Sequence, residues 1–412
     1  MSLPQSKGSP FDVVILGGGP AGSHLAIRLA QRGRRVALVE ARRFPRPKPC
    51  GEFMSPECLD LLEDLGLKNR VLDAGACRIR KMQLYGYGRR AKGSFLGRDL
   101  QMGGGIFGLG LRREILDEIS LRAAADEEGV TLFEGRRGSH ILRDSKGYVE
   151  GVCLNPRNGF AEEIHGEFTI GADGLRSLLA REMKVFRKAG SPEKLAFVYR
   201  FSGLPPQDFA EVHFVDGGYL IAAPIDGGKV TLNLIIERNA WKEVKNKEEL
   251  LRVKLMEAPL LEAKLKRGVQ EDKVLSVGPL ASETSTQVFD GAALVGDACG
   301  FVDPLTGEGM YFAMRGAAIL APVLDRALAE GRRDRGSLLA YVKARRKEFG
   351  PRFALARALQ VGVRRPWVAK GILSLLAARP GLMDLLVTVT GDSVGPLKAL
   401  HPQILFPALL RR

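Results

Sequence analysis

The feature that most constrains the fold is the segment at residues 11–44, FDVVILGGGPAGSHLAIRLAQRGRRVALVEARRF. A short apolar run rich in β-branched residues is followed by GxGxxG, formed by Gly17, Gly19 and Gly22. Helical periodicity then ends at Gly33, and a second apolar run ends at Glu40. The order of strand, glycine turn, helix, strand and acid predicts a Rossmann-type dinucleotide-binding unit in an α/β protein.

Each position has a physical reason in such a unit. Gly17 permits the tight turn, Gly19 lets a pyrophosphate approach the backbone, and Gly22 lets the helix pack on the strand. The helix N-terminus attracts the phosphates, and the acid can accept a hydrogen bond from a ribose hydroxyl. The candidate cofactor-binding residues of this segment are Gly17, Gly19, Pro20, Ala21, Gly22, Glu40, Ala41 and Arg42.

A second glycine pattern, GGGIFG at residues 103–108, is not a second unit of this kind. The polar run GRDLQM precedes it, and no strand that ends in an acid follows it. We predict a loop that leads into a helix over RREILDEISLRAAADEEG, residues 112–129.

Composition narrows the class of protein. The 412 residues allow two to three domains, and the formal net charge is +15. Basic residues are spread along the chain, with one concentration at residues 332–352. We expect this run to form the solvent-exposed face of a helix. We find no zinc-finger spacing and no RNP-type motif, so no nucleic-acid partner is expected. No pattern of metal ligands stands out either.

The cysteines and the chain start suggest a compartment. Five cysteines occur, none in a CxxC pattern, and the first ten residues are a small polar tail rather than an export signal. No apolar run reaches the ~18 residues of a membrane span. We expect a cytoplasmic protein with free thiols.

Two later segments again read as strand, glycine turn and helix. The first is FTIGADGLRSLLAREM, with Asp173 and Gly174 in the turn. The second is GAALVGDACGFVDPLTGEGMYFAMRGAA, with Gly296 and Asp297 before a Pro/Gly loop and a long apolar helix. A plain NAD dehydrogenase would instead continue with alternating strands and helices.

The three motifs in this order, over about residues 11–330, resemble the FAD-dependent superfamily of aromatic hydroxylases (monooxygenases), flavin-dependent halogenases and geranylgeranyl reductases. The resemblance implies that Asp297, beside Gly296, holds the ribityl chain of FAD. It implies that Asp173 and Gly174 serve FAD and a passing NAD(P)H, and that Arg113 points at the cofactor. The residues it implies beside the flavin ring are Pro304, Gly307, Glu308 and Gly309.

The resemblance also sets the expected domains. The FAD-binding domain would comprise residues 11–75, 105–185 and 275–330, and a mostly antiparallel sheet over 76–104 and 186–274 would roof the flavin. Strand-like runs at 194–203, 210–228 and 229–238 agree with this. Residues 331–412 would be helical. These helices have three readings: an ordinary pair packed on the core, which we favour, a cover over an apolar substrate, or an interfacial helix in peripheral contact with a membrane.

Motif details separate the branches of the superfamily. The halogenase motif GxWxWxIP has GGYLIAAP as its counterpart at residues 217–224, where Tyr219 and Ile221 replace the tryptophans. Halogenation is therefore disfavoured. The reductase motif YxWxFP keeps Tyr219 and Pro224, and the reductases carry a Cys-Gly-Glu where this chain has Cys50, Gly51 and Glu52.

The candidate catalytic residues are Cys50, Glu52 and Tyr219, and Cys50 and Gly51 are also candidates for cofactor binding. Cys50 has three readings: a flavin-side residue, a packing residue or a nucleophile. We rank the nucleophile last because no histidine lies within ten residues to act as a base.

The expected function is that of an FAD-dependent oxidoreductase in which NAD(P)H-reduced flavin acts on a hydrophobic small molecule of isoprenoid, polyketide or aromatic type. Double-bond reduction and hydroxylation both remain open, because the cofactor carries the chemistry. The non-enzyme alternative is a basic flavoprotein that docks on anionic partners or membranes as a redox module.

Overall fold

The computed structural model describes residues 11–97, 105–157, 160–188, 193–241, 246–271, 273–280, 282–301, 304–391 and 393–411. The polar tail at residues 1–10 and most of the GRDLQM and GGGIFG segments therefore lie outside the described residues.

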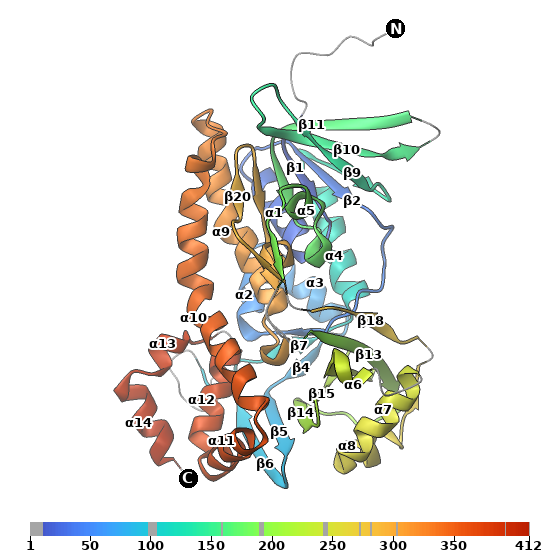
Figure 1. Ribbon diagram of the computed structural model, residues 1–412, viewed down its shortest axis with the longest axis vertical. Coiled ribbons are helices and arrows are strands. Elements are labelled where there is room, and N and C mark those ends of the chain that lie inside the picture. Colours follow the sequence, from blue (N-terminus) through green and yellow to red (C-terminus); the bar gives the residue numbers. More distant parts are fainter. Residues whose placement is uncertain are drawn as a thin grey trace.

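The first of two large sheets occupies the upper part of Figure 1. Its strand order is β20-β21-β11-β1-β2-β8, and β21, β11, β1, β2 and β8 run parallel. Antiparallel β9 and β10 extend β11 beyond the sheet. The strands are β1 (Phe11–Leu16), β2 (Val36–Glu40), β8 (Val130–Glu134), β9 (Gly138–Arg143), β10 (Val149–Arg157), β11 (Phe160–Gly171), β20 (Val288–Phe289) and β21 (Ala292–Leu294).

Helices cover this sheet because its strands are apolar on both faces, as parallel strands usually are. The helix α1 (Pro20–Ala30) packs between α4 (Arg113–Asp126) and α9 (Gly309–Ala329) on one face. On the other face lies the short helix α5 (Leu178–Glu182). The helices α2 (Pro56–Glu63) and α3 (Lys68–Asp73) complete the core of the first face.

The second large sheet has the order β17-β13-β16-β15-β14-β5-β6, and β18 also pairs with β13. Its pairs are antiparallel except for β14 with β5. The helices α7 (Lys247–Met256) and α8 (Pro259–Leu265) cover one face. The strands are β5 (Lys81–Gly86), β6 (Arg89–Ser94), β13 (Lys194–Ser202), β14 (Phe209–Val215), β15 (Gly218–Ile225), β16 (Lys229–Glu237), β17 (Val269–Gln270) and β18 (Leu275–Val277).

Two three-stranded sheets join the large ones. In the first, β7 (Gly108–Gly110) pairs with β3 (Phe53–Met54) and with β4 (Cys77–Ile79). In the second, β19 (Ser282–Thr284) pairs with β12 (Phe186–Lys188) and with β22 (Gly300–Phe301). Both sheets therefore connect segments of the first sheet's domain with segments that lead into the second.

The C-terminal region is helical. The long α10 (Leu339–Val363) runs beside α9, and α11 (Pro366–Ala378) and α12 (Pro380–Thr390) pack against β6 (Figure 1). The short helices α13 (Pro396–Ala399) and α14 (Pro402–Leu410) follow. Among the described residues no single helix is long and apolar enough to span a membrane; α11 and α12 pass such a test only as a pair bent by 110°.

The predicted fold class is confirmed: a parallel FAD-type sheet with helices, a mostly antiparallel second sheet and C-terminal helices. Two details differ from the expectation. The strand β18 pairs with β13 in the second sheet, so that sheet extends past the expected boundary at residue 274. Gly108 begins strand β7 rather than closing a loop, and the predicted helix follows as α4.

Candidate functional site

A cavity of about 550 Å³ lies between the two large sheets. One half, here called the cofactor half, is formed mainly by turns and helix starts of the first sheet's domain. The other, here called the substrate half, is formed by the inner face of the second sheet and by neighbouring apolar side chains. The cofactor half comprises Gly19, Pro20, Ala21, Lys48, Pro49, Cys50, Gly51, Arg113, Ala172, Asp173, Gly174, Leu175, Arg176, Gly296, Asp297, Gly300, Thr306, Gly307, Glu308, Gly309, Met310 and Ala313.

The glycine turn after β1 has the geometry that a dinucleotide site requires. Gly17 has φ +105°, and a Cβ there would lie 2.6 Å from the carbonyl oxygen of Ala172. A Cβ at Gly22 would lie 1.8 Å from the carbonyl oxygen of Gly17. A side chain at Gly22 would push α1 away from the turn, and one at Gly17 would push the turn away from Ala172, which follows β11. Gly19 instead opens onto the cavity, with only Arg46 within 4 Å of where its Cβ would be.

Glu40, at the end of β2, holds the same turn in place. Its Oε2 accepts a hydrogen bond from the backbone N–H of Gly18 at 2.8 Å, and its Oε1 accepts one from Arg42 at 2.8 Å. Ala41 and Arg42 are exposed beside it. Glu40, Ala41 and Arg42 do not line the cavity. They lie where the second strand ends, which is the place of the nucleoside end in a unit of this kind.

Three cations gather near the N-terminus of α1. The Arg46 guanidinium lies 3.5 Å from Asp117 and 3.7 Å from Glu40. Arg113 forms two hydrogen bonds with Asp117, at 2.7 and 2.8 Å. Burial lowers the pKa of Arg113, but the charges and hydrogen bonds of Asp117 and Cys50 outweigh burial and raise it. Arg113 therefore stays charged at the cavity.

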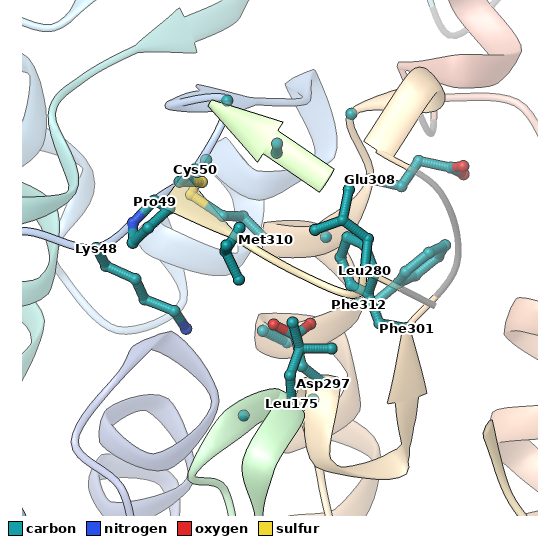
Figure 2. A pocket seen from close by; sticks show the side chains of 18 of the residues that line it. Lys48, Pro49, Cys50, Leu175, Leu280, Asp297, Phe301, Glu308, Met310 and Phe312 are labelled. Atoms are coloured by element: carbon teal, nitrogen blue, oxygen red, sulfur yellow. The ribbon is translucent and has the colours of Figure 1, made fainter. Parts of the chain in front are cut away.

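Lys48 is the third cation, and its side chain extends into the cavity toward Asp297 (Figure 2). Burial and the neighbouring charge of Arg113 lower the pKa of Lys48, and Asp297 opposes this. The described residues offer Lys48 no ion pair within 4 Å. A diphosphate at the start of α1 would supply the missing negative charge, so these residues fit a dinucleotide.

The two downstream turns meet the first one at the cavity. Asp173 follows β11, and its Oδ2 accepts a hydrogen bond from the backbone N–H of Leu178 at 2.7 Å. Asp297 lies in a 3-10 turn after β21, and Figure 2 shows its carboxylate facing the cavity. Gly307 and Gly309 border the cavity at the start of α9. Pro304 begins a short 3-10 turn, and its side chain lies outside the described part of the chain.

Glu308 lines the cavity, but its carboxylate points away from it in Figure 2. Its Oε1 lies 3.7 Å from the guanidinium of Arg352 on α10, and both side chains are buried. Glu308 therefore ties the turn at the start of α9 to α10.

Cys50 and Gly51 line the cavity, whereas Glu52 does not. Cys50 is half-buried beside Met310 (Figure 2) and packs against the core of the first domain. Glu52 is fully buried with φ +56°. Its carboxylate forms hydrogen bonds with Arg200 of β13, with donor–acceptor distances of 2.5 and 3.3 Å, and Arg200 also binds Glu114 of α4 at 2.8 and 2.9 Å.

Glu52 is therefore a correction among the catalytic candidates, because its carboxylate is buried against Arg200 and does not line the cavity. Burial raises the pKa of this carboxyl, although Arg200 works against the rise. Its role in the structure is to join the Cys50 loop, the first sheet's domain and the second sheet.

The substrate half is almost entirely apolar. Alternate residues of β13, β15 and β16 face it, as the two-residue period of a strand requires. Its polar side chains are Asn233, whose Nδ2 lies 3.4 Å from Thr231, Ser282 and Arg345. The substrate half comprises Phe53, Met82, Ala196, Val198, Ala210, Ile221, Ala223, Asn233, Ile235, Val277, Gly278, Pro279, Leu280, Ser282, Phe301, Leu305, Phe312, Arg345 and Phe353.

Tyr219 is a second correction among the catalytic candidates. It shares a strand face with Ile221 and Ala223, but it is 1% exposed and does not line the cavity. Its ring packs in a cluster with Ala196, Leu280 and Ile235, behind the cavity wall. The residues that stand at the cavity on this strand are Ile221 and Ala223.

Sequence reasoning missed several lining residues. Lys48, Asn233, Leu280, Met310 and Phe312 line the cavity, but no sequence motif singled them out. The basic run at 332–352 is only partly a wet helix face: Lys343, Arg346 and Lys347 are exposed, but Arg345 lines the cavity and Arg352 is buried against Glu308. Phe349, which lies between Arg345 and Arg352 and is buried, was the signal, because a large apolar residue inside a basic run marks a buried helix face.

Comparisons with known proteins agree with this geometry. A family model described as FAD binding domain matches residues 10–350. A menaquinone reductase of Mycobacterium tuberculosis is 26% identical, covering 93% of this chain and 91% of its own length. A digeranylgeranylglycerophospholipid reductase of Methanothrix thermoacetophila is 28% identical, covering 83% of this chain and 85% of its own length.

Among solved structures, the flavin-dependent brominase Bmp2 superposes with a TM-score of 0.80 at 21% identity. The superposition covers 92% of this chain and 93% of the brominase. This similarity shows a shared fold.

Proposed function

Since this chain belongs to the family described as FAD binding domain, a family of FAD-dependent oxidoreductases, we propose that it uses NAD(P)H-reduced FAD to reduce a carbon–carbon double bond in an apolar substrate. The observation that carries the proposal is the makeup of the substrate half. The inner face of the second sheet presents aliphatic side chains, and its polar contribution to the described lining is Asn233.

Among the described residues that line the cavity from that face, none is ionisable, which favours reduction over aromatic hydroxylation. An aromatic hydroxylase gains from a polar group that holds or deprotonates a phenol, whereas an isolated double bond needs only to be held dry and close to the flavin. A wall of Val198, Ile221 and Ile235 can do that. The two reductases with similar sequences support the same choice.

The residues of the cofactor half have separable roles. FAD, when bound, supplies the redox chemistry. The N-terminus of α1, with Arg46, Lys48 and Arg113, would bind the diphosphate, and the Asp297 carboxylate would accept hydrogen bonds from the ribityl hydroxyls. Backbone N–H groups at the start of α9 would stabilise negative charge on the reduced cofactor.

Reduction of a double bond also consumes a proton. The thiol of Cys50 lies at the cavity, where it can donate that proton to the substrate. In this role Cys50 never bonds covalently to the substrate, and solvent returns its proton.

The test is turnover of the FAD-loaded protein with and without oxygen. NADH or NADPH is the reductant, and geranylgeraniol, a menaquinone-type quinone and a simple phenol are the substrates. We expect an anaerobic product that has gained two hydrogen atoms. A product that forms only in air and has gained oxygen would overturn the proposal, and a halogenated product in the presence of halide would show a halogenase instead.

A membrane partner is a second proposal, carried by the surface of α11, α13 and α14. Trp367, Leu397 and Leu410 are 74%, 71% and 77% exposed. Residues 361–412 contain seven basic residues (Arg364, Arg365, Lys370, Arg379, Lys398, Arg411 and Arg412) against two acids (Asp384 and Asp392). Exposed apolar side chains among basic ones suit a surface of anionic lipid.

Liposome flotation tests the membrane proposal. The protein should bind vesicles with anionic lipid, less so at high salt, and Trp367→Glu should weaken binding. The matched control is Leu260→Glu, which changes an equally exposed apolar residue on α8. Equal binding by the two variants would contradict the proposal, and binding without any turnover would favour the redox-module alternative.

A further inference from the structure

A second, smaller cavity, here called the tail chamber, lies under the C-terminal helices. Its volume is about 70 Å³, and it is enclosed by β5 and β14 on one side and by α10, α11 and α12 on the other. Its lining comprises Met82, Leu84, Val212, Phe214, Leu305, Thr306, Leu359, Val363, Ala369, Ile372, Leu373, Leu376, Met383, Leu386, Val387 and Thr390.

The tail chamber adjoins the substrate half of the main cavity. Met82 and Leu305 of the substrate half, together with Thr306 of the cofactor half, line both the main cavity and the tail chamber. The side chains of these three residues therefore form the partition between the main cavity and the tail chamber. Met82 has three rotatable side-chain bonds and is the partition residue best able to move aside.

The chemistry of the tail chamber admits hydrocarbon and little else. Fourteen of its sixteen lining residues are apolar. The hydroxyl of Thr390 lies 3.0 Å from the carbonyl oxygen of Leu386 and 3.2 Å from that of Val387, so it is already used within α12. An apolar cavity of this kind stays dry and binds small hydrocarbons.

The volumes of the main cavity and the tail chamber suit different parts of one ligand. The main cavity, at about 550 Å³, would be shared by the cofactor and the reactive part of the substrate, whereas about 70 Å³ accommodates a few carbon atoms of a chain. Ile372 lines the tail chamber and is 38% exposed, so the chamber lies one side chain from the outer surface of α11. A chain longer than the chamber could continue past Ile372.

We propose that the tail chamber is a subsite for the hydrocarbon tail of the substrate, whose reactive double bond lies in the main cavity. The inference rests on the proposed function and deepens it. It names the substrate class as molecules with a linear apolar chain beyond the reactive group, and it gives α10–α12 a role in selecting chain length.

The experiment uses 4-alkylphenols with chains of increasing length as probes of the FAD-loaded, oxidised protein. The change in flavin absorbance on titration reports the Kd of each probe. Each methylene that enters the tail chamber should tighten binding about fourfold. Ala369→Phe, which fills the chamber, should end this increase at a shorter chain and leave the Kd of the shortest probe unchanged.

Two further variants keep the test decisive. Ala377→Phe adds the same ring to the exposed side of α11 and should leave the series unchanged. Leu359→Ala enlarges the chamber at a half-buried position and should extend the increase to longer chains.

The failure of this inference differs from that of the proposed function. If the alkylphenols change the flavin absorbance, but the dependence of Kd on chain length is the same in the parent, Ala369→Phe and Leu359→Ala, the tail-chamber proposal alone is wrong. A flavin spectrum that no alkylphenol changes would overturn the apolar site beside FAD, and the tail chamber with it.

Discussion

The cofactor half and the substrate half of one cavity are built in opposite ways. The cofactor half is made of backbone turns, a helix start and paired charges, most of them within three short segments of sequence. The substrate half is made of small and aliphatic side chains from many strands. The cofactor half suits one fixed molecule that approaches the backbone closely. The substrate half requires only a complementary shape and the exclusion of water.

The difference predicts how each half responds to change. Where the backbone itself is the binding surface, an added side-chain atom collides with other backbone atoms. These atoms cannot move aside without disturbing the fold. A wall of side chains can be reshaped with the fold intact. The cofactor half should therefore fail completely when altered, and the substrate half should change its preference.

The largest effect is expected at the glycine turn. Gly22→Ala places a Cβ 1.8 Å from the carbonyl oxygen of Gly17, so α1 must leave the strand, at a cost on the order of 5 kcal/mol. Thermal unfolding and FAD content should both show the loss. Gly350→Ala, with no atom within 4 Å of the new Cβ, should leave both intact and gives the control. Normal FAD content in Gly22→Ala would contradict the claim that the glycine turn of the cofactor half tolerates no added atom.

The second-largest effect is expected for the ion pair of Glu52 and Arg200, which joins the first sheet's domain to the second sheet. Arg200→Gln leaves the buried Glu52 without its charged partner, which should lower the free energy of unfolding by about 3–5 kcal/mol. Arg357→Gln breaks an exposed pair with Glu283 and should cost about 0–1 kcal/mol. Chemical denaturation measures both. Similar stabilities for the two variants would mean that Glu52 and Arg200 do not join the halves.

A smaller effect is expected for FAD affinity. Asp297→Ala removes the carboxylate that we propose as the acceptor for the ribityl hydroxyls, and it should weaken FAD binding by about 1.5–3 kcal/mol. Titration of the apoprotein with FAD measures this. The surface variant Glu330→Ala should bind FAD as the parent does, and equal affinities in the two variants would remove Asp297 from the site.

The smallest effect is spectral. Cys50→Ser should retain FAD but shift its absorbance or slow its reduction by NAD(P)H, because Cys50 lies at the cavity. Cys58→Ser, buried on α2 beside Ser55, should leave both properties alone. If neither variant differs from the parent, Cys50 is a packing residue.

Prediction from sequence succeeded where the information is local. The glycine turn and Glu40 lie within 24 residues of each other, and the strand–turn–helix order specifies their arrangement. The fold class followed from three such segments. The motif comparison also named Tyr219 as a catalytic candidate, but no local pattern shows that the cavity lining on β15 includes Ile221 and Ala223 and stops short of Tyr219.

What could not be predicted depends on contacts between distant segments. Glu52 and Arg200 are 148 positions apart, so no local pattern shows that this carboxylate is turned away from the cavity. The same holds for Arg352, which is buried only because α10 lies beside the start of α9. The tail chamber exists because α11 and α12 return to cover β5 and β14.

The most direct test of the contrast between the halves is a paired measurement on Asp297→Ala and Ile221→Asn. For each, the Kd for FAD and the Kd of the FAD-loaded protein for a short 4-alkylphenol are determined. Ile221→Asn should bind FAD as the parent does but lose about tenfold or more in alkylphenol affinity, since it replaces buried apolar surface. Asp297→Ala should show the reverse. If Ile221→Asn lowers FAD affinity as much as Asp297→Ala does, the two halves are not separately specified and the account is wrong.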